Sequence, residues 1–292
     1  MLWPLFALLS GTSQATGDAL TKNLLSRGAN RWYLAAFTFL MAGGLSLILW
    51  LGWQRTIPPE RFWLAVAATG VLNVVAIQIK YHALSKGELS LVAPMLAFSP
   101  AFNIVTAWII VGDRVSIGGS MGVLLVVAGS YILHGKPGDS LGRPLRRIFA
   151  DSSARAMLLV ALIYGVSTSF DKMAVQTGGV IATMTASSLV IGTMTLIAAM
   201  VIVRPNAETT RGSIQESLRG AVPLAILFGA EALLQYQALT AGAAPYVMSM
   251  KRLSILIAVL YGRLFFREAF PLRRGVGGVV MIVGHASIIF GA

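Results

Sequence analysis

The residues in this sequence that could do chemistry are charged side chains within long apolar segments. A charge near the centre of a bilayer costs at least ~2.5–3.5 kcal/mol on insertion scales, so each one needs a partner or a ligand. We place five cations and three anions in such segments, a balance of +2 that would suit an anion in a central cavity. They are Asp18, Lys22, Lys80, Asp171, Lys172, Glu231, Lys251 and Arg252.

Lys251 and Arg252 are the strongest of these signals, because residues 246–260 carry no other charge. Two adjacent cations on one helix repel each other and require acids or a ligand. Arginine offers a planar fork to a phosphate or carboxylate, and lysine offers a mobile point charge. Two interpretations stay open: the pair binds an anionic substrate, or it forms an internal salt bridge with Glu231 as the candidate acid.

Glu231 belongs to a second polar group, in which Gln235 lies four residues further along the same helix face and Tyr236 lies beside it. We expect all three to contact substrate. Glu231 has two possible roles. It could neutralise Arg252, in which case the nearby cation would lower the pKa of its carboxyl group, or it could carry a coupling proton, in which case burial would raise that pKa.

The other candidates lie in the first, third and sixth expected helices. Asp18 and Lys22 have the i, i+4 spacing of a favourable helical pair. They lie near a helix end, so a place in the cavity and a snorkelling pair at the rim both fit. Lys80 also lies in a last turn, where snorkelling is the plainer interpretation, and Asp171 and Lys172 lie well inside their helix.

The composition is that of an integral membrane protein. The chain is 56% hydrophobic and 12% charged, with a mean hydropathy of +0.76, whereas a soluble domain carries about twice that share of charge. The net charge of +12 comes largely from loop arginines, which would meet anionic lipid rather than nucleic acid. There are no cysteines, and the three histidines lack metal-ligand spacing, so we expect no metal and no cofactor.

The apolar runs are about 20 residues long, enough to cross the hydrocarbon core as helices. We predict an all-α membrane protein with ten transmembrane helices. They are expected at about 2–22, 32–52, 62–84, 89–111, 116–134, 155–175, 179–203, 218–241, 244–266 and 272–291. Pro94 and Pro100 should interrupt the fourth helix, whereas Pro223 and Pro245 fall near expected helix starts, where proline is harmless.

The chain also repeats itself. A shift of 155 residues aligns Tyr81 with Tyr236, Leu84 with Leu239, Asp113 with Glu268, Gly122 with Gly277 and Gly129 with Gly284. We therefore predict two five-helix repeats, residues 1–134 and 155–292, joined by a basic linker at 135–154. Because five is odd, the second repeat should be inverted relative to the first.

Glycines recur seven residues apart in the fifth and tenth expected helices, at Gly122 and Gly129 and at Gly277, Gly284 and Gly291. Small residues let helix backbones approach closely in lipid. The sequence leaves open whether these faces pack within one chain or between the chains of a homodimer.

The chain resembles the EamA-type branch of the drug/metabolite transporter superfamily over nearly its whole length. The resemblance lies in the duplicated Ala83-Leu84 and Ala238-Leu239 segments, in Asp113 and Glu268 after the fourth helix of each half, and in the glycine-rich helices that follow. It implies a multi-pass protein of the inner (plasma) membrane that moves a small-molecule substrate such as a metabolite, amino acid, sugar or nucleotide sugar. Relatives are usually drawn with cytoplasmic termini, whereas the loop charges place both termini outside, so the orientation stays open.

Lys251 and Arg252 resemble a pair in the ninth helix of the plastid phosphate translocators, where the pair grips the substrate phosphate. That resemblance implies binding of an anionic head group. We therefore expect a secondary-active transporter of a small organic anion or zwitterion, with a coupling proton or a counter-substrate as candidate energy sources.

Two other functions remain as alternatives. An exporter of amino acids or hydrophobic drugs would use the Lys251–Arg252 pair as a structural salt bridge. A membrane-embedded enzyme would need a nucleophile, a metal site or converging acids, and the chain has no HExxH, Walker A or Ser-His pattern. We accordingly predict that the chain is not an enzyme.

Overall fold

The computed structural model describes residues 2–53, 57–86, 93–133, 152–203, 207–254 and 272–291. Over these ranges the regular structure is helical, as predicted, and it falls on the ten expected spans when η1 and α5 are taken together. The elements are α1 (Trp3–Ser26), α2 (Arg31–Trp53), α3 (Glu60–Lys86), η1 (Ala93–Phe98), α5 (Ser99–Val111), α6 (Ile117–Leu133), α8 (Ser152–Gly178), α9 (Val180–Ile202), α10 (Ala207–Leu239), α11 (Ala244–Lys251) and α13 (Leu272–Gly291).

Several expectations concern residues beyond these ranges. The start of the fourth predicted helix at 89–92, nearly all of the linker, the remainder of the ninth predicted helix and Glu268 lie outside the described residues. The sixth predicted helix begins slightly earlier than expected, because α8 starts at Ser152.

Five of the described helices, α2, α3, α8, α9 and α10, contain stretches long and apolar enough to cross a membrane. Large apolar side chains cover their outer surfaces, with Val201 78% exposed and Ile48 70% exposed. Such a surface would aggregate in water but is the expected surface toward lipid. The chain is therefore a multi-pass membrane protein.

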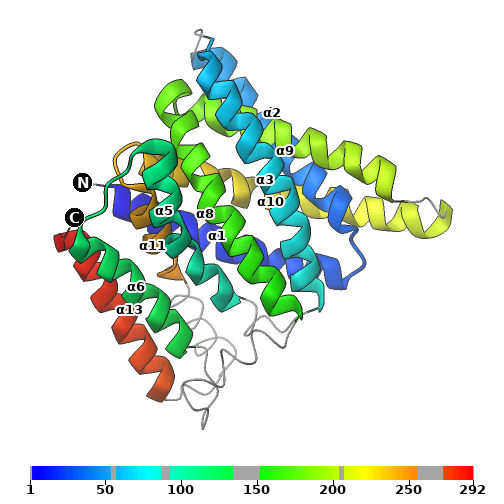
Figure 1. The fold of residues 1–292 in the computed structure, drawn as a ribbon. Coiled ribbons are helices and arrows are strands. Elements are labelled where there is room, and N and C mark those ends of the chain that lie inside the picture. Colours follow the sequence, from blue (N-terminus) through cyan, green and yellow to red (C-terminus); the bar gives the residue numbers. More distant parts are fainter. Residues whose placement is uncertain are drawn as a thin grey trace.

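The helices pack in pairs that join early and late parts of the chain. α1 packs on α10, α2 on α9, α3 on α8, and α6 on α13; the last pair lies side by side at one edge of Figure 1. α5 also packs on α8, and α11 on α1. We call α3, η1, α5 and α8 the α8 bundle, and α1, α10 and α11 the α10 bundle.

The prolines act on the helices in two ways. The fourth span begins as the 3-10 turn η1 and becomes α-helical only at α5, which has Pro100 in its first turn. Pro245 lies in the first turn of α11, as expected. The expectation for Pro223 was wrong: α10 begins at Ala207, eleven residues before the predicted start, so that this proline lies inside the helix.

The glycine faces of α6 and α13 pack against each other within one chain. A Cβ added to Gly122 would lie 2.6 Å from the carbonyl oxygen of Gly284, and a Cβ added to Gly284 would lie 2.7 Å from that of Gly122. A Cβ on Gly129 would lie 2.7 Å from the Gly277 carbonyl oxygen. These contacts leave no room for a side chain between the two backbones.

Replacing Gly284 with alanine should therefore destabilise the protein by about 1–3 kcal/mol, because backbone atoms must move to admit the methyl group. The free energy of unfolding in mixed micelles measures this effect. Gly44→Ala is the matched control, since its Cβ would meet nothing within 4 Å. Equal effects of the two substitutions would contradict the close approach of α6 and α13.

Candidate functional site

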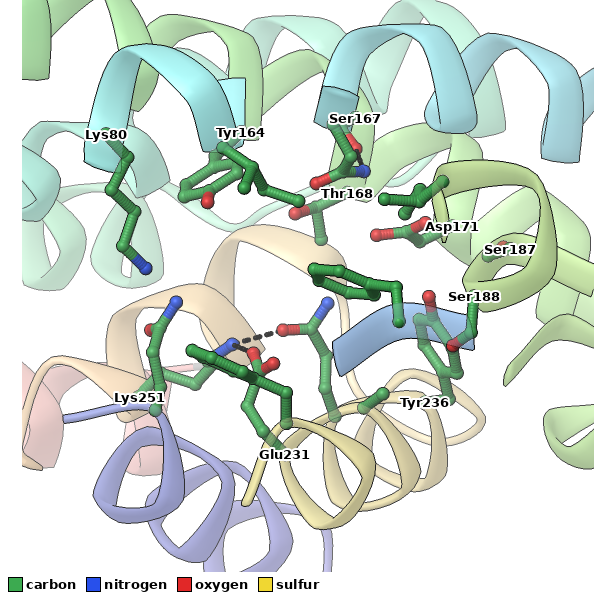
Figure 2. Close-up of a pocket in the computed structure, with 18 of the residues that line it drawn as sticks. Lys80, Tyr164, Ser167, Thr168, Asp171, Ser187, Ser188, Glu231, Tyr236 and Lys251 are labelled. Atoms are coloured by element: carbon green, nitrogen blue, oxygen red, sulfur yellow. Dashed lines mark hydrogen bonds and ion pairs between the residues drawn. The ribbon is translucent and has the colours of Figure 1, made fainter. Parts of the chain in front are cut away.

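A polar cavity of about 90 Å³ lies between the two bundles, with one wall completed by α2 and α9. A single buried water needs roughly 10–15 Å³ of such volume, so this cavity has room for several waters. Figure 2 shows Lys80, Tyr164 and Asp171 on one side of the cavity, and Glu231 and Lys251 on the other. The lining residues are Gln14, Phe39, Asn73, Ile77, Lys80, Tyr81, Tyr164, Ser167, Thr168, Asp171, Ser187, Ser188, Ile191, Phe228, Glu231, Ala232, Gln235, Tyr236, Met248, Lys251 and Arg252.

Helical spacing explains how this set converges. On α8, Tyr164, Thr168 and Asp171 follow the i, i+4, i+7 pattern that places side chains on one helix face. Two other helices present faces of the same kind, with Asn73, Ile77 and Lys80 on α3 and with Phe228, Glu231 and Gln235 on α10.

The end of α11 places Lys251 and Arg252 at the cavity. The helix ends at Lys251, and the amide of Arg252 donates instead to the Ser249 carbonyl oxygen, at 2.9 Å, in a tighter turn. Gly11 of α1 lies directly against this point, because a Cβ added to it would come within 2.9 Å of the Lys251 Cα. α11 thus ends within the ninth predicted helix, at the position of its two charges.

Lys251 is engaged on the α10 side of the cavity. Its Nζ donates to Glu231 Oε1 at 2.6 Å and also to Gln235 Oε1, as the dashed lines in Figure 2 show. This is the internal salt bridge that the sequence left as an alternative. Glu231 accordingly neutralises Lys251 rather than Arg252.

Arg252 has a different environment, although it is equally buried. One of its terminal nitrogens donates to Ser99 Oγ at 2.8 Å, and the other lies 3.5 Å from Gln14 Oε1. Its buried Nε has no hydrogen-bond partner. Within the described ranges, no carboxylate lies within ion-pair distance of this guanidinium.

Lys80 lines the cavity and is 3% exposed, so it does not snorkel to a surface. Its partner is Asp18 of α1, at 2.5 Å. The structure thus pairs Asp18 across two helices rather than with Lys22 along its own helix. Neither Asp18 nor Lys22 lines the cavity, and Asp18 acts on it only through its ion pair with Lys80.

Lys172 points away from the cavity, although its neighbour Asp171 lines it. Lys172 Nζ lies 2.7 and 2.8 Å from the two carboxylate oxygens of Asp113 and donates to the Gly242 carbonyl oxygen at 3.0 Å. The amide of Ala244 donates to the same carboxylate at 2.8 Å. This cluster ties the end of α5 to α8 and to the turn before α11.

Asp171 accepts a hydrogen bond from Thr69 Oγ1 at 2.7 Å. The same hydroxyl lies 2.7 Å from Ser167 Oγ, to which Asn73 also donates, at 2.6 Å. No cation in the described part of the chain lies within ion-pair distance of Asp171. The result is a buried carboxylate held in a row of hydroxyl and amide groups.

Sequence reasoning missed these hydroxyls as site residues. The signal was present in Ser167-Thr168-Ser169, three consecutive hydroxyl residues that end two positions before Asp171 in an apolar helix. Serine and threonine are common at helix contacts in membranes, so their presence alone does not indicate a cavity. Ser169 in fact faces the helix contact, where it accepts from Asn103 of α5 at 2.9 Å.

A metal site does not form among these groups: within the described residues, no three histidine, aspartate or glutamate side chains converge. The cavity instead offers hydrogen-bond donors, hydroxyls, aromatic rings and a small number of charges. This lining suits a small polar organic molecule.

Comparisons with known proteins give a matching family and a similar fold. The sequence profile of the EamA-like transporter family matches residues 1–134 and 152–290. No curated protein matches the chain. Among the solved structures that share the fold is one described as a crystal structure of a protein, with a TM-score of 0.68 and 14% sequence identity, over the whole of this chain and 97% of the other. Because the matched ranges take in almost the whole sequence, the chain belongs to the EamA-like transporter family.

Proposed function

We propose that this protein is a secondary-active transporter of a small organic anion or zwitterion, which it moves by alternating access through the central cavity. One observation carries the substrate class: Arg252 is a buried guanidinium on the cavity wall without a carboxylate partner among the described residues. A cation held in that way needs a counter-charge, and a substrate carboxylate or phosphate supplies one.

Arg252 and Lys251 would then contribute unequally. Two of the three donors of the Lys251 ammonium are taken by Glu231 and Gln235, which leaves one for substrate. Arg252 keeps its Nε and part of its terminal donors, in the fork that matches a carboxylate. Arg252 is therefore the main anion contact, and Lys251 is the auxiliary contact.

The helix contacts support two inverted repeats. Exchanging each helix with the one five spans away turns the α1–α10 contact into α8–α3, and the α5–α8 contact into α11–α1. The α2–α9 and α6–α13 contacts are unchanged by the exchange. A pseudo-two-fold axis between residues 1–134 and the second half would produce this pattern.

The bundles, rather than the sequence halves, would be the units that move. Each bundle contains helices from both halves, and the cavity lies between the two bundles. Rocking of the α8 bundle against the α10 bundle, with α2 and α9 as the connecting wall, would open the cavity to one side of the membrane and then to the other.

The alternative function is an exporter of amino acids or hydrophobic drugs in which the cationic pair is structural. The Lys251–Glu231 salt bridge supports a structural role for Lys251. Phe39, Tyr164 and Phe228 would then form an aromatic substrate pocket. Such an exporter would not depend on the charge of Arg252.

Arg252→Gln should weaken the binding of carboxylates or phosphorylated sugars at least about tenfold, because it removes the charged fork from the wall. The measurement is thermal stabilisation of purified protein by phosphorylated sugars, carboxylates, amino acids and cationic drugs. Arg61→Gln, at an exposed arginine outside the cavity, is the control. Hits confined to neutral or cationic compounds, unchanged in Arg252→Gln, would refute the anion site and support the exporter.

A further inference from the structure

The charges around the cavity cancel in pairs except at two places. Lys80 is compensated by Asp18, and Lys251 by Glu231. Among the charged residues that line the cavity, this leaves one cation, Arg252, and one anion, Asp171. Neither lies within ion-pair distance of an opposite charge in the described part of the chain.

The two residues come from opposite sides of the cavity. Asp171 belongs to α8, on the wall that also carries Lys80 and Tyr164 in Figure 2, whereas Arg252 follows the end of α11 in the other bundle. The structure records no contact between them. A ligand that satisfies both would therefore lie across the cavity and touch both bundles.

A carboxylate as buried as that of Asp171 is energetically unfavourable in a bilayer unless it has a cationic partner or a ligand. Asp171 is 5% exposed, and its carboxylate oxygen receives the Thr69 hydroxyl rather than a cation. A hydrogen bond from a neutral hydroxyl does not replace the hydration of a charge, so a buried carboxylate of this kind calls for a cation. Asp171 lines the cavity, so a cation bound there could reach it.

We infer that the substrate is a zwitterion, with its ammonium group at Asp171 and its carboxylate or phosphate at Arg252. This inference rests on the proposed function and narrows its substrate class. A simple anion would satisfy Arg252 and add a second negative charge near the uncompensated Asp171. A zwitterion satisfies both groups and keeps the cavity neutral, which lowers the cost of holding charges away from water.

The hydroxyl groups beside Asp171 support an ammonium ligand with N–H donors. Ser167 and Thr168 line the same wall within one turn of the carboxylate. Their oxygens can accept hydrogen bonds, and an ammonium group carries several donors. The wall thus offers a carboxylate and additional acceptors to one cationic group.

The experiment measures binding of three matched sets of probes to the purified full-length protein, by thermal shift and by isothermal titration. The sets are α- and ω-amino acids of two to six carbons, the monocarboxylates of the same length, and the alkylamines of the same length. For the amino acid that binds best, we expect at least tenfold tighter binding than for either single-charge analogue.

Asp171→Asn, which changes the charge but hardly the shape, should abolish this preference, so that the amino acid and its carboxylate analogue bind within about threefold of each other. Glu60→Gln is the matched control, because it removes an exposed carboxylate outside the cavity. It should leave the preference unchanged.

The outcomes separate this inference from the proposed function. Wild-type protein that binds the monocarboxylate as tightly as the amino acid, in an Arg252-dependent way, would overturn the zwitterion inference and leave the anion site intact. The same conclusion would follow if Asp171→Asn kept the preference for the amino acid over its carboxylate analogue. Binding that ignores Arg252 altogether would refute the proposed function itself. The wild-type comparison decides the matter even if Asp171→Asn does not fold.

Discussion

Lys172→Met should destabilise the protein by about 3–5 kcal/mol, because it leaves a largely buried carboxylate without its cation. Lys172 lies 2.7 Å from Asp113, and their side chains are 8% and 13% exposed. The Ala244 amide would remain as a donor to Asp113, but one neutral donor does not compensate the charge. Unfolding in mixed micelles measures the loss.

A double variant shows whether the loss comes from the orphaned charge. Lys172→Met/Asp113→Asn should recover much of the stability, since residues in contact show strong non-additivity. Lys86→Met, at an exposed lysine at the end of α3, is the control and should change stability by less than about 0.5 kcal/mol. Simple addition of the two single effects would contradict the ion-pair explanation.

Lys251→Met should have a comparable cost, about 3–5 kcal/mol, because it leaves Glu231 buried without its cation. The two groups are 2.6 Å apart, and their side chains are 5% and 17% exposed. Adding Glu231→Gln should restore most of the stability. The same double variant then measures what Lys251 contributes to binding, free of any folding defect.

Two results are distinguishable in that double variant. If Lys251 is auxiliary, the affinity for the best anion or zwitterion falls only a few-fold, while Arg252→Gln costs at least tenfold. A loss in the double variant as large as that of Arg252→Gln would show that the two cations bind substrate equally. Titration of both variants with the same ligand makes the comparison.

The sequence predicted the helices well, because a run of about 20 apolar residues is by itself enough to identify a membrane-spanning helix. It was less accurate at the ends of helices, where the length of an apolar run is not the deciding factor. The early start of α10 at Ala207 lies in a polar segment that adds nothing to an apolar run. The end of α11 at Lys251 occurs where the helix meets Gly11, 240 residues away in the chain.

For the site, the sequence identified the charged residues but not their partners. Local spacing favoured Asp18 with Lys22, whereas tertiary packing brought Lys80 to Asp18. Asp171 and Lys172 were both candidate site residues, but successive positions on a helix point about 100° apart. One of them therefore faces the cavity, and the other faces Asp113.

The pairing of early with late helices has a consequence for biogenesis. Ser99 meets Arg252 only after another 153 residues have been synthesised, and Thr69 meets Asp171 after another 102. The first five spans must therefore wait in the bilayer with polar faces uncovered, because their partners have not yet emerged from the ribosome. Native contacts of such long range make assembly slow. During that interval the nascent chain would be exposed to membrane quality control, and an insertase or chaperone that shields α3 and α5 would raise the yield of folded protein.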